Sequence, residues 1–171
     1  MKISLLLRNL VILTAILLNI GCDQVTKNIA RNKIEYHETI RVVDNFLTLT
    51  RVENTGAFLS LGSNMPGFIK LVILNVLPVM VMLWGLYLVI GKTNMSKLLV
   101  TGLCFVIGGG AGNLYDRIRF GSVTDFLHMN FGLFQTGIFN MADVSIMIGM
   151  GVVLVDIYLK QQILRIQDME E

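Results

Sequence analysis

Long apolar stretches dominate the order of hydrophobic and polar positions along the chain. A helix needs about 20 mostly apolar residues to cross a bilayer, and four stretches approach or reach that length. They are Ile3 to Val25, Gly67 to Ile90, Leu98 to Tyr115 and Met141 to Leu159. Pro78 lies near the middle of the second stretch and predicts a kink there. The pattern therefore predicts an all-α membrane protein with four transmembrane helices.

Two longer polar segments separate these stretches. Residues 28–66 form the first loop, in which Thr39 to Phe46 and Phe46 to Val52 show the partial alternation of β-strands. Residues 119–139 form the second loop, with strand character from Phe131 to Phe139. We expect a small β-sheet on the membrane surface, beside the helices, in a single integral membrane domain that covers residues 1–171.

Composition supports a chain that is partly covered by lipid. Hydrophobic residues make up 54% of the sequence and charged residues only 15%, whereas about 25% is charged in an ordinary soluble domain. Membrane lipid is therefore an expected partner. A net charge of +2, with no block of like charges, gives no basis for nucleic-acid binding.

Four spans place both chain ends on one side of the membrane and the two loops on the other. Six basic residues would then lie on the side of the termini and eight on the side of the loops. Basic residues normally mark the cytoplasmic side, but these numbers are too similar to decide the orientation.

The cysteines and histidines indicate neither a disulfide framework nor a metal. Cys22 and Cys104 both lie inside apolar stretches, which predicts two reduced thiols in the core. His37 and His128 have no metal-ligand spacing, and the sequence contains no HExxH or CxxC motif. We expect no metal and no cofactor.

The first apolar stretch also resembles the signal peptide of a lipoprotein, because it ends in Gly21-Cys22. Asn19 stands where such a signal has an aliphatic residue, and three more apolar stretches follow. These two features favour a transmembrane helix that continues through Cys22.

Ionisable side chains at membrane depth cost free energy, so each is a candidate for function. Asp23 and Lys27 are four residues apart, on one face of the first helix, which would also suit a simple interfacial ion pair. Asn113, Asp116 and Arg117 share a face at the end of the third helix, after a glycine-rich run that allows close approach.

Two further carboxylates belong to the same end of the predicted bundle. Asp125 lies in the second loop, and Asp143 lies one turn into the fourth helix, where Asn140 is a candidate N-cap. The helix dipole alone would favour an acid at position 143. Asp156 is roughly 20 Å further along that helix, near Lys160, and we expect an interfacial residue without a catalytic role.

If Asp125 and Asp143 meet, their like charges in a low dielectric prevent both from ionising at once. A pair that shares one proton can deprotonate a water and protonate a peptide carbonyl, which is aspartic protease chemistry. Two nucleophilic alternatives are weaker. Ser122, Asp125 and His128 are too close in sequence for ordinary triad geometry, and nothing in the pattern requires a serine–lysine dyad.

Five short motifs in order give a specific resemblance. They are Asp23 to Lys27 (DQVTK), Asn54 to Ala57 (NTGA), Gly112 to Arg117 (GNLYDR), Val123 to Phe126 (VTDF) and Phe139 to Asp143 (FNMAD). Together the chain resembles lipoprotein signal peptidase, or signal peptidase II. Two positions depart from the family pattern: Phe58-Leu59 replaces Ala-Phe after the second motif, and Gly110 replaces an alanine.

The resemblance implies that Asp125 and Asp143 are the catalytic pair of an aspartic endopeptidase. It assigns substrate binding or support of the site to Asp23, Lys27, Asn54, Gly56, Asn113, Asp116, Arg117, Asn140 and Ala142. The implied substrate is a prolipoprotein that carries diacylglycerol on a cysteine, cut just before that cysteine. The resemblance also implies inhibition by globomycin-type cyclic peptides. It places the protein in the bacterial inner membrane, with cytoplasmic termini and an extracytoplasmic site.

Two other functions are consistent with the same polar residues. A transporter or channel could use Asp125, Asp143 and Arg117 as an ion or proton relay, but a relay needs polar residues spread across the membrane. A non-catalytic assembly factor would not need the acidic pair at all. The clustering of polar residues near one membrane face favours the peptidase.

Overall fold

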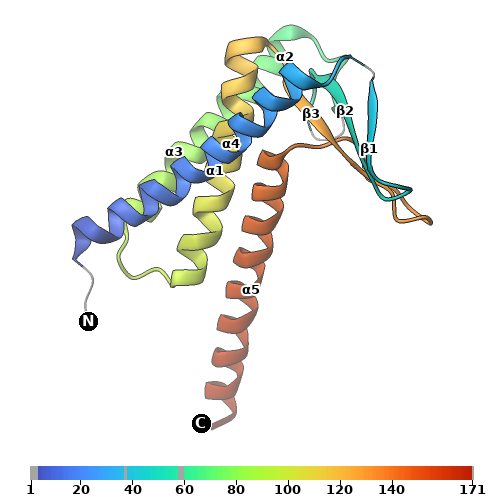
Figure 1. Cartoon of the computed structure of the whole chain (residues 1–171). Coiled ribbons are helices and arrows are strands. Elements are labelled where there is room, and N and C mark those ends of the chain that lie inside the picture. Colours follow the sequence, from blue (N-terminus) through green and yellow to red (C-terminus); the bar gives the residue numbers. More distant parts are fainter. Residues whose placement is uncertain (1–3, 37, 58–59, 171) are drawn as a thin grey trace.

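The computed structural model describes residues 4–36, 38–57 and 60–170, and it shows a helical bundle with a small sheet at one end (Figure 1). The helical elements are α1 (Leu5–Lys33), α2 (Gly67–Leu71), the π-helical turn η2 (Val72–Val76), α3 (Leu77–Gly91), α4 (Lys97–Phe120) and α5 (Met141–Glu170). Among the described residues, four helical runs are long and apolar enough to cross a membrane, as predicted. Both ends of the chain lie at the end of the bundle away from the sheet.

Helix α1 extends eight residues beyond the predicted end of the first span. It continues through Cys22 to Lys33, because the polar side chains of Asp23 and Lys27 are fully buried against other helices. Cys22, however, is exposed, together with Val25 and Ile29 on the same face. The prediction of two core thiols is therefore wrong for Cys22, which lies on the outer face of α1. It is right for Cys104, and both cysteines are free.

The second span, in which Pro78 predicted a kink, contains a π-helical turn just before the proline. Helix α2 passes into η2, and α3 follows with Pro78 near its start. The backbone N–H of Leu77 donates to Val72 O, five residues earlier, which is the π-helical spacing. Pro78 has no N–H of its own to continue an ordinary helical ladder. The irregularity thus occupies the turn before the proline.

Helix α4 packs against α1, α3 and α5, so it forms the centre of the bundle. Glycines make its contact with α5 very close. A Cβ on Gly102 would lie 2.8 Å from Gly149 O, and a Cβ on Gly149 would lie 2.6 Å from Gly102 O. The close approach predicted for the glycine-rich run further along α4 is confirmed too, because a Cβ on Gly108 would lie 3.1 Å from Ile16 O of α1 and a Cβ on Gly109 would clash with Ala142 O of α5.

A three-stranded antiparallel sheet covers the other end of the bundle. It consists of β1 (Thr39–Val43), β2 (Leu47–Asn54) and β3 (Val123–Met129), in the order β1-β2-β3. The first two strands agree with the prediction. The prediction of a strand over Phe131 to Phe139 is wrong, because the third strand precedes that segment. The chain turns at Gly132, which has a φ of 82°, and returns with only isolated bridges.

A small hydrophobic cluster fixes the sheet to the bundle. Ala30 and Ile34, at the end of α1, are buried against Phe126 of β3. Asp125 is the neighbour of Phe126 in the strand, so this packing also determines where that carboxylate lies.

Candidate active site

The carboxylate of Asp125 is held in β3 by two amide side chains. Asn54 Nδ2, from the neighbouring strand β2, donates to Asp125 Oδ2 at 3.0 Å. Asn140 Nδ2, from the residue before α5, donates to Asp125 Oδ1 at 2.6 Å. The Asp125 side chain is only 4% exposed. Each carboxylate oxygen therefore has a neutral donor, and no cation of the described residues is in direct contact with it.

Asp143 lies in the first turn of α5 and forms a reciprocal cap with Asn140. The backbone N–H of Asp143 donates to Asn140 Oδ1 at 3.0 Å, and the backbone N–H of Asn140 donates to Asp143 Oδ2 at 3.2 Å. Asn113 Nδ2, from α4, donates to Asp143 Oδ1 at 2.9 Å. Asn140 is thus the predicted N-cap, and the same side chain contacts Asp125. The structure brings both predicted carboxylates together around this one residue.

Burial raises the pKa of Asp125 to about 6. The hydrogen bonds from Asn54 and Asn140 lower that pKa, and the charge of nearby Asp143 raises it. Asp125 consequently retains a proton at a pH where an ordinary aspartate has lost it.

A buried ion network is connected to Asp143 through Asn113. Lys27 Nζ lies 2.9 Å from Asp23 Oδ2 and 2.9 Å from Asp116 Oδ2, and all three side chains are fully buried. Lys27 Nζ also donates to Asn113 Oδ1 at 2.8 Å. This bond directs the amide nitrogen of Asn113 towards Asp143, so Lys27 determines the orientation of a donor to the carboxylate pair. From the sequence, Asp23 and Lys27 could have formed a simple interfacial ion pair. In the structure they instead belong to a buried network that includes Asp116.

Asp23 connects the same network to the start of α5. Its Oδ1 accepts a hydrogen bond from the backbone N–H of Ala142 at 2.9 Å, and Ala142 is fully buried. Gly112 allows this approach, because a Cβ there would lie 2.5 Å from Asp23 Oδ2. The first helix therefore fixes the turn that carries Asp143.

Four residues of this network were not predicted individually. Gln24 Nε2 donates to Asp23 Oδ2 at 3.0 Å and to Asp116 Oδ1 at 3.1 Å. Arg31 Nη2 lies 2.9 Å from Asp116 Oδ1, and Arg31 Nε donates to Thr124 Oγ1 at 2.8 Å. Thr124 Oγ1 in turn donates to Glu53 Oε1 at 2.9 Å. The position of Arg31 one turn beyond Lys27, on the same face of α1, is the signal that could have identified it.

The Asn54–Ala57 segment forms a compact turn beside the pair. Asn54 Oδ1 accepts from the backbone N–H of Gly56 at 2.9 Å, and Asn54 Nδ2 also donates to Ala57 O at 3.0 Å. Arg117 Nη2 donates to Gly56 O at 3.0 Å. A Cβ on Gly56 would lie 2.6 Å from Leu61 O, which explains the glycine. The family departure at Phe58-Leu59 lies outside the described residues.

A cavity of about 590 Å³ opens next to Asp143. Asp143, Asn113 and Arg117 form its polar wall. The remainder of the lining is apolar or glycine: Ala57, Ile73, Leu74, Pro78, Gly110, Ile146 and Met147. The cavity can therefore accept an apolar chain with a few polar groups directed at the carboxylate.

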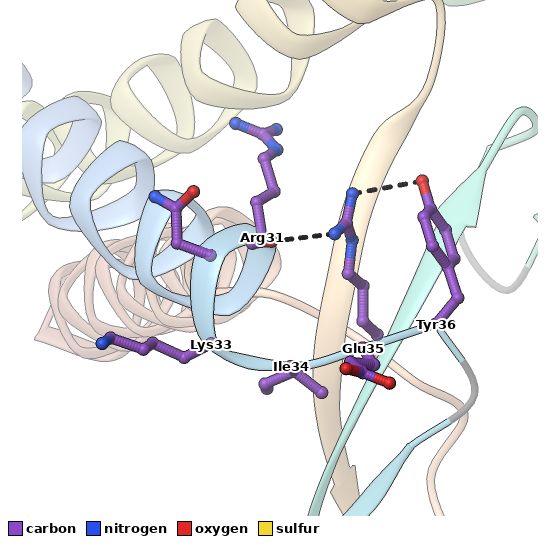
Figure 2. Close-up of a pocket in the computed structure, with 7 residues that line it drawn as sticks. Arg31, Lys33, Ile34, Glu35 and Tyr36 are labelled. Atoms are coloured by element: carbon purple, nitrogen blue, oxygen red, sulfur yellow. Dashed lines mark hydrogen bonds between the residues drawn. The ribbon is translucent and has the colours of Figure 1, made fainter.

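A second cavity, of about 560 Å³, lies where the end of α1 meets β2 (Figure 2). Its lining includes Arg31, Tyr36 and Arg51 but neither aspartate of the pair. Arg51 donates to Arg31 O at 2.9 Å and to the Tyr36 hydroxyl at 3.1 Å. Dashed lines mark these bonds beside the labelled Arg31 and Tyr36 in Figure 2. These bonds join the sheet to the helix, whereas Asp143 of the carboxylate pair lines the other cavity.

The nucleophilic alternatives are not supported by the geometry. Along β3, Asp125 and His128 alternate to opposite faces, and Ser122 Oγ donates to Glu53 Oε2 at 2.7 Å. Lys27 is buried in its ion network and is not available to a serine.

The structure agrees with the expected position of Asp156 near Lys160 but shows a buried side chain. Asp156 pairs with Lys160 at 2.7 Å. It accepts a hydrogen bond from Ser96, which begins α4, so it joins two helices at the end of the bundle that carries the termini.

The comparisons with known proteins agree with one another. The sequence model of the family described as Signal peptidase (SPase) II matches residues 15–159. The lipoprotein signal peptidase of Syntrophus aciditrophicus is 36% identical over 82% of this chain and 87% of its own. The lipoprotein signal peptidase of Enterococcus faecalis is 36% identical over 82% of this chain and 81% of its own.

Solved structures show the same fold. One is described as a bacterial membrane enzyme structure by the in meso method at 2.3 Å resolution. It matches with a TM-score of 0.79 at 23% identity, over 88% of this chain and 89% of that chain. A second, at 1.9 Å, gives a TM-score of 0.73 at 21% identity.

The sequence match, the fold and the four membrane helices lead to one conclusion. This chain belongs to the signal peptidase II family, the aspartic peptidases that remove signal peptides from prolipoproteins.

Proposed function

We propose that Asp125 and Asp143 are the catalytic dyad of this peptidase. The observation that carries the proposal is that both carboxylates are hydrogen-bonded to Asn140. A cavity lies beside them, and of the two carboxylates Asp143 is the one in its lining. The other buried carboxylates of the described residues are paired with lysine or arginine. The contacts of Asp125 and Asp143 are instead amide and backbone donors, which leave the protons of the pair free to move.

The dyad divides the chemistry between its two members. Asp125 holds the proton, because its burial raises its pKa to about 6. Asp143 holds the negative charge, which the N-terminus of α5 and the Asn113 amide stabilise. The Asp143 carboxylate takes a proton from a water, whose oxygen attacks the scissile carbonyl carbon, while Asp125 gives its proton to the carbonyl oxygen.

The second half of the reaction restores both groups. The resulting gem-diol collapses as the proton on Asp143 passes to the amide nitrogen, the C–N bond breaks and a diol hydroxyl returns its proton to Asp125. No covalent intermediate with the enzyme forms. The pair begins and ends with one shared proton, so the next substrate meets the same state of the dyad.

Arg117 and Asn113 position the peptide over the dyad in this proposal. Both line the cavity, and Arg117 Nη2 already holds the Asn54–Ala57 turn through Gly56 O. The Nε atom of Arg117 is buried without a hydrogen-bond partner among the described residues, so it can donate to a substrate carbonyl. This arrangement fixes the scissile bond relative to Asp143.

The substrate is a diacylglyceryl-modified prolipoprotein, cut just before the lipid-modified cysteine. The apolar wall formed by Ile73, Leu74 and Pro78 suits the signal peptide and an acyl chain that enter sideways from membrane lipid. Globomycin-type cyclic peptides, which carry both peptide and lipid character, would compete for the same cavity.

The membrane placement completes the proposal. The protein lies in the bacterial inner membrane with both termini in the cytoplasm, so that the sheet and the dyad lie at the extracytoplasmic face. The common position of the two chain ends, opposite the sheet, supports this topology (Figure 1).

The decisive experiment uses the isosteric variants Asp125→Asn and Asp143→Asn of the full chain in bilayers. Each is expected to bind a lipid-modified prolipoprotein and to leave it uncleaved on a gel, because one member of the proton pair is lost. The variant Asp156→Asn, at the opposite end of the bundle, is the matched control and should process the substrate normally. Normal processing by either dyad variant would refute the assignment.

A further inference from the structure

The end of the sheet farthest from the bundle carries a cluster of exposed apolar side chains. We define the aromatic tip as Phe46, Phe131, Leu133 and Phe134. Leu133 is fully exposed, Phe134 is 64% exposed, and Phe131 and Phe46 are 46% and 40% exposed. Exposed apolar clusters of this kind normally mark a surface that contacts another phase or partner.

The aromatic tip is built by two adjacent turns. Phe46 lies in the turn between β1 and β2, and the other members lie in the turn that follows β3. The backbone N–H of Asn130 donates to Phe46 O at 2.8 Å, which joins the two turns. The rings of Phe46 and Phe131 meet edge to face at 5.4 Å, and those of Phe131 and Phe134 stack at 4.7 Å. The exposed side chains therefore form one ordered surface.

The charge pattern separates the two turns. The β1–β2 turn carries Asp44 and follows Arg41 of β1, both of them exposed. The turn over residues 130–135 has no ionisable residue, and none occurs between His128 and Asp143. A turn directed into water ordinarily carries charged or small polar residues, whereas this one carries aromatic and aliphatic side chains at its apex.

The position of the tip identifies what it meets. In Figure 1 the sheet leans away from the bundle, and its tip ends at about the level of the first turns of α5, below the top of α4. The exposed apolar side chains of those turns of α5, such as Met147 and Ile148, contact lipid in a membrane protein. The tip thus reaches the depth at which the lipid-covered surface of the bundle begins.

We propose that the aromatic tip inserts into the interfacial region of the bilayer leaflet on the active-site side and anchors the sheet there. Phe and Leu side chains of membrane-surface elements are buried at that depth, because their apolar groups reach the boundary between the headgroups and the acyl chains. The charged residues of the neighbouring turn, Asp44 and Arg41, then lie among the headgroups. Since β3 carries Asp125 and the tip follows β3, the bilayer itself becomes the second support of that strand, besides the cluster around Phe126.

Fluorescence in bilayers tests the insertion independently of any catalytic role. The full chain with Trp84→Phe is given one new tryptophan, through Leu133→Trp at the tip or Thr39→Trp at the opposite, exposed end of β1. Phospholipid vesicles contain lipids brominated near the top of the acyl chain. We expect the Leu133→Trp protein to lose emission in these vesicles relative to vesicles without bromine, because an interfacial side chain lies near the top of the acyl chains. The Thr39→Trp protein should respond to aqueous acrylamide instead.

Two results would overturn the proposal. One is quenching of the Leu133→Trp protein by acrylamide as strong as that of the Thr39→Trp protein, with no effect of brominated lipid. The other is protection from both quenchers, which would place the tip against protein, such as a second copy of the chain. Because Leu133 is fully exposed, its substitution is compatible with the fold, and Phe134→Trp provides a second reporter in the same turn.

Discussion

Two helices of the bundle begin with a side chain that caps the helix and also donates a hydrogen bond to a carboxylate. Asn140 begins α5 at the end near the sheet, accepts from the N–H of Asp143 and donates to the carboxylate of Asp125. Ser96 begins α4 at the other end, accepts from the N–H of Leu99 and donates to the carboxylate of Asp156. Each cap therefore joins its helix to a buried acid from a different segment.

The two ends differ in what else surrounds the acid. Asp156 is neutralised by Lys160 at 2.7 Å, and it does not line either cavity. Within the described part of the chain, the side-chain hydrogen bonds to the Asp125 carboxylate come from two amides, and its partner Asp143 faces a cavity of about 590 Å³. Burial of an acid is thus not sufficient for chemistry. An acid becomes reactive where its partners are neutral, a second acid is near and a substrate can reach the pair.

The largest difference between the two ends is expected from their lysines. Lys27→Met leaves Asp23 buried without its lysine and Asp116 with Arg31 as its cation, and loss of a buried partner costs about 3–5 kcal/mol. We expect a large fall in the thermal unfolding midpoint in micelles and loss of processing. Lys160→Met removes a half-exposed partner of Asp156 and should change neither the unfolding midpoint nor the processing rate noticeably. Similar unfolding midpoints for the two variants would contradict the network.

A smaller difference is expected from two glycines of adjoining helices. A Cβ in Gly112→Ala would lie 2.5 Å from Asp23 Oδ2, so the carboxylate that holds Ala142 must move. We expect a cost of about 1–3 kcal/mol, as for other overpacked positions, and slower processing. Gly21→Ala adds a Cβ with nothing within 4 Å and serves as the control. If both variants unfold at the wild-type temperature, the close contact is not important for stability.

The two caps allow the most closely matched pair. Asn140→Ala and Ser96→Ala should each cost about 1 kcal/mol of stability, the usual value for an N-cap. Only Asn140→Ala removes a donor to Asp125, so we expect its processing rate to fall on the order of 100-fold, whereas Ser96→Ala should retain the wild-type rate. Kinetics with a lipid-modified prolipoprotein, together with unfolding midpoints, separate the two effects. Equal rates would show that Asn140 is only a cap.

The smallest change concerns a single proton. Asp125 must be protonated to act as the acid, and its pKa is raised to about 6, so activity should be present below that pH and be lost as the pH rises through it. Above about pH 6 the rate should fall about tenfold per unit. Because the hydrogen bond from Asn54 lowers the pKa of Asp125, Asn54→Ala should move the fall in rate to higher pH. A profile unchanged by that substitution would contradict the assignment of the acid.

Much of the bundle could be predicted from the sequence because lipid imposes a simple rule on length and polarity. The four spans and two strands followed from that rule and from strand alternation. The extension of α1 to Lys33 could not, because its polar last turns are stabilised by contacts with α4 and the sheet. The third strand was misplaced, because the apolar run at 131–134 forms an exposed turn rather than a strand.

The site was predictable in its members but not in its connections. Asp125, Asp143 and Asn140 stood out as polar residues at membrane depth. Nothing in their spacing shows that the Asn140 side chain contacts both acids, or that Lys27 orients Asn113. The bond between Lys27 and Asn113 joins residues that are 86 positions apart, and only packing of the helices brings them together.

One measurement tests most directly whether the acids at the two ends of the bundle differ in function. It is the rate at which Asp143→Asn and Asp156→Asn, in the same bilayers, release the signal peptide from a lipid-modified prolipoprotein. Each substitution replaces an acid on α5 by its neutral isostere. The account predicts no detectable cleavage by Asp143→Asn with substrate binding retained, and cleavage at the wild-type rate by Asp156→Asn. Cleavage by Asp143→Asn at a rate similar to that of Asp156→Asn would contradict it.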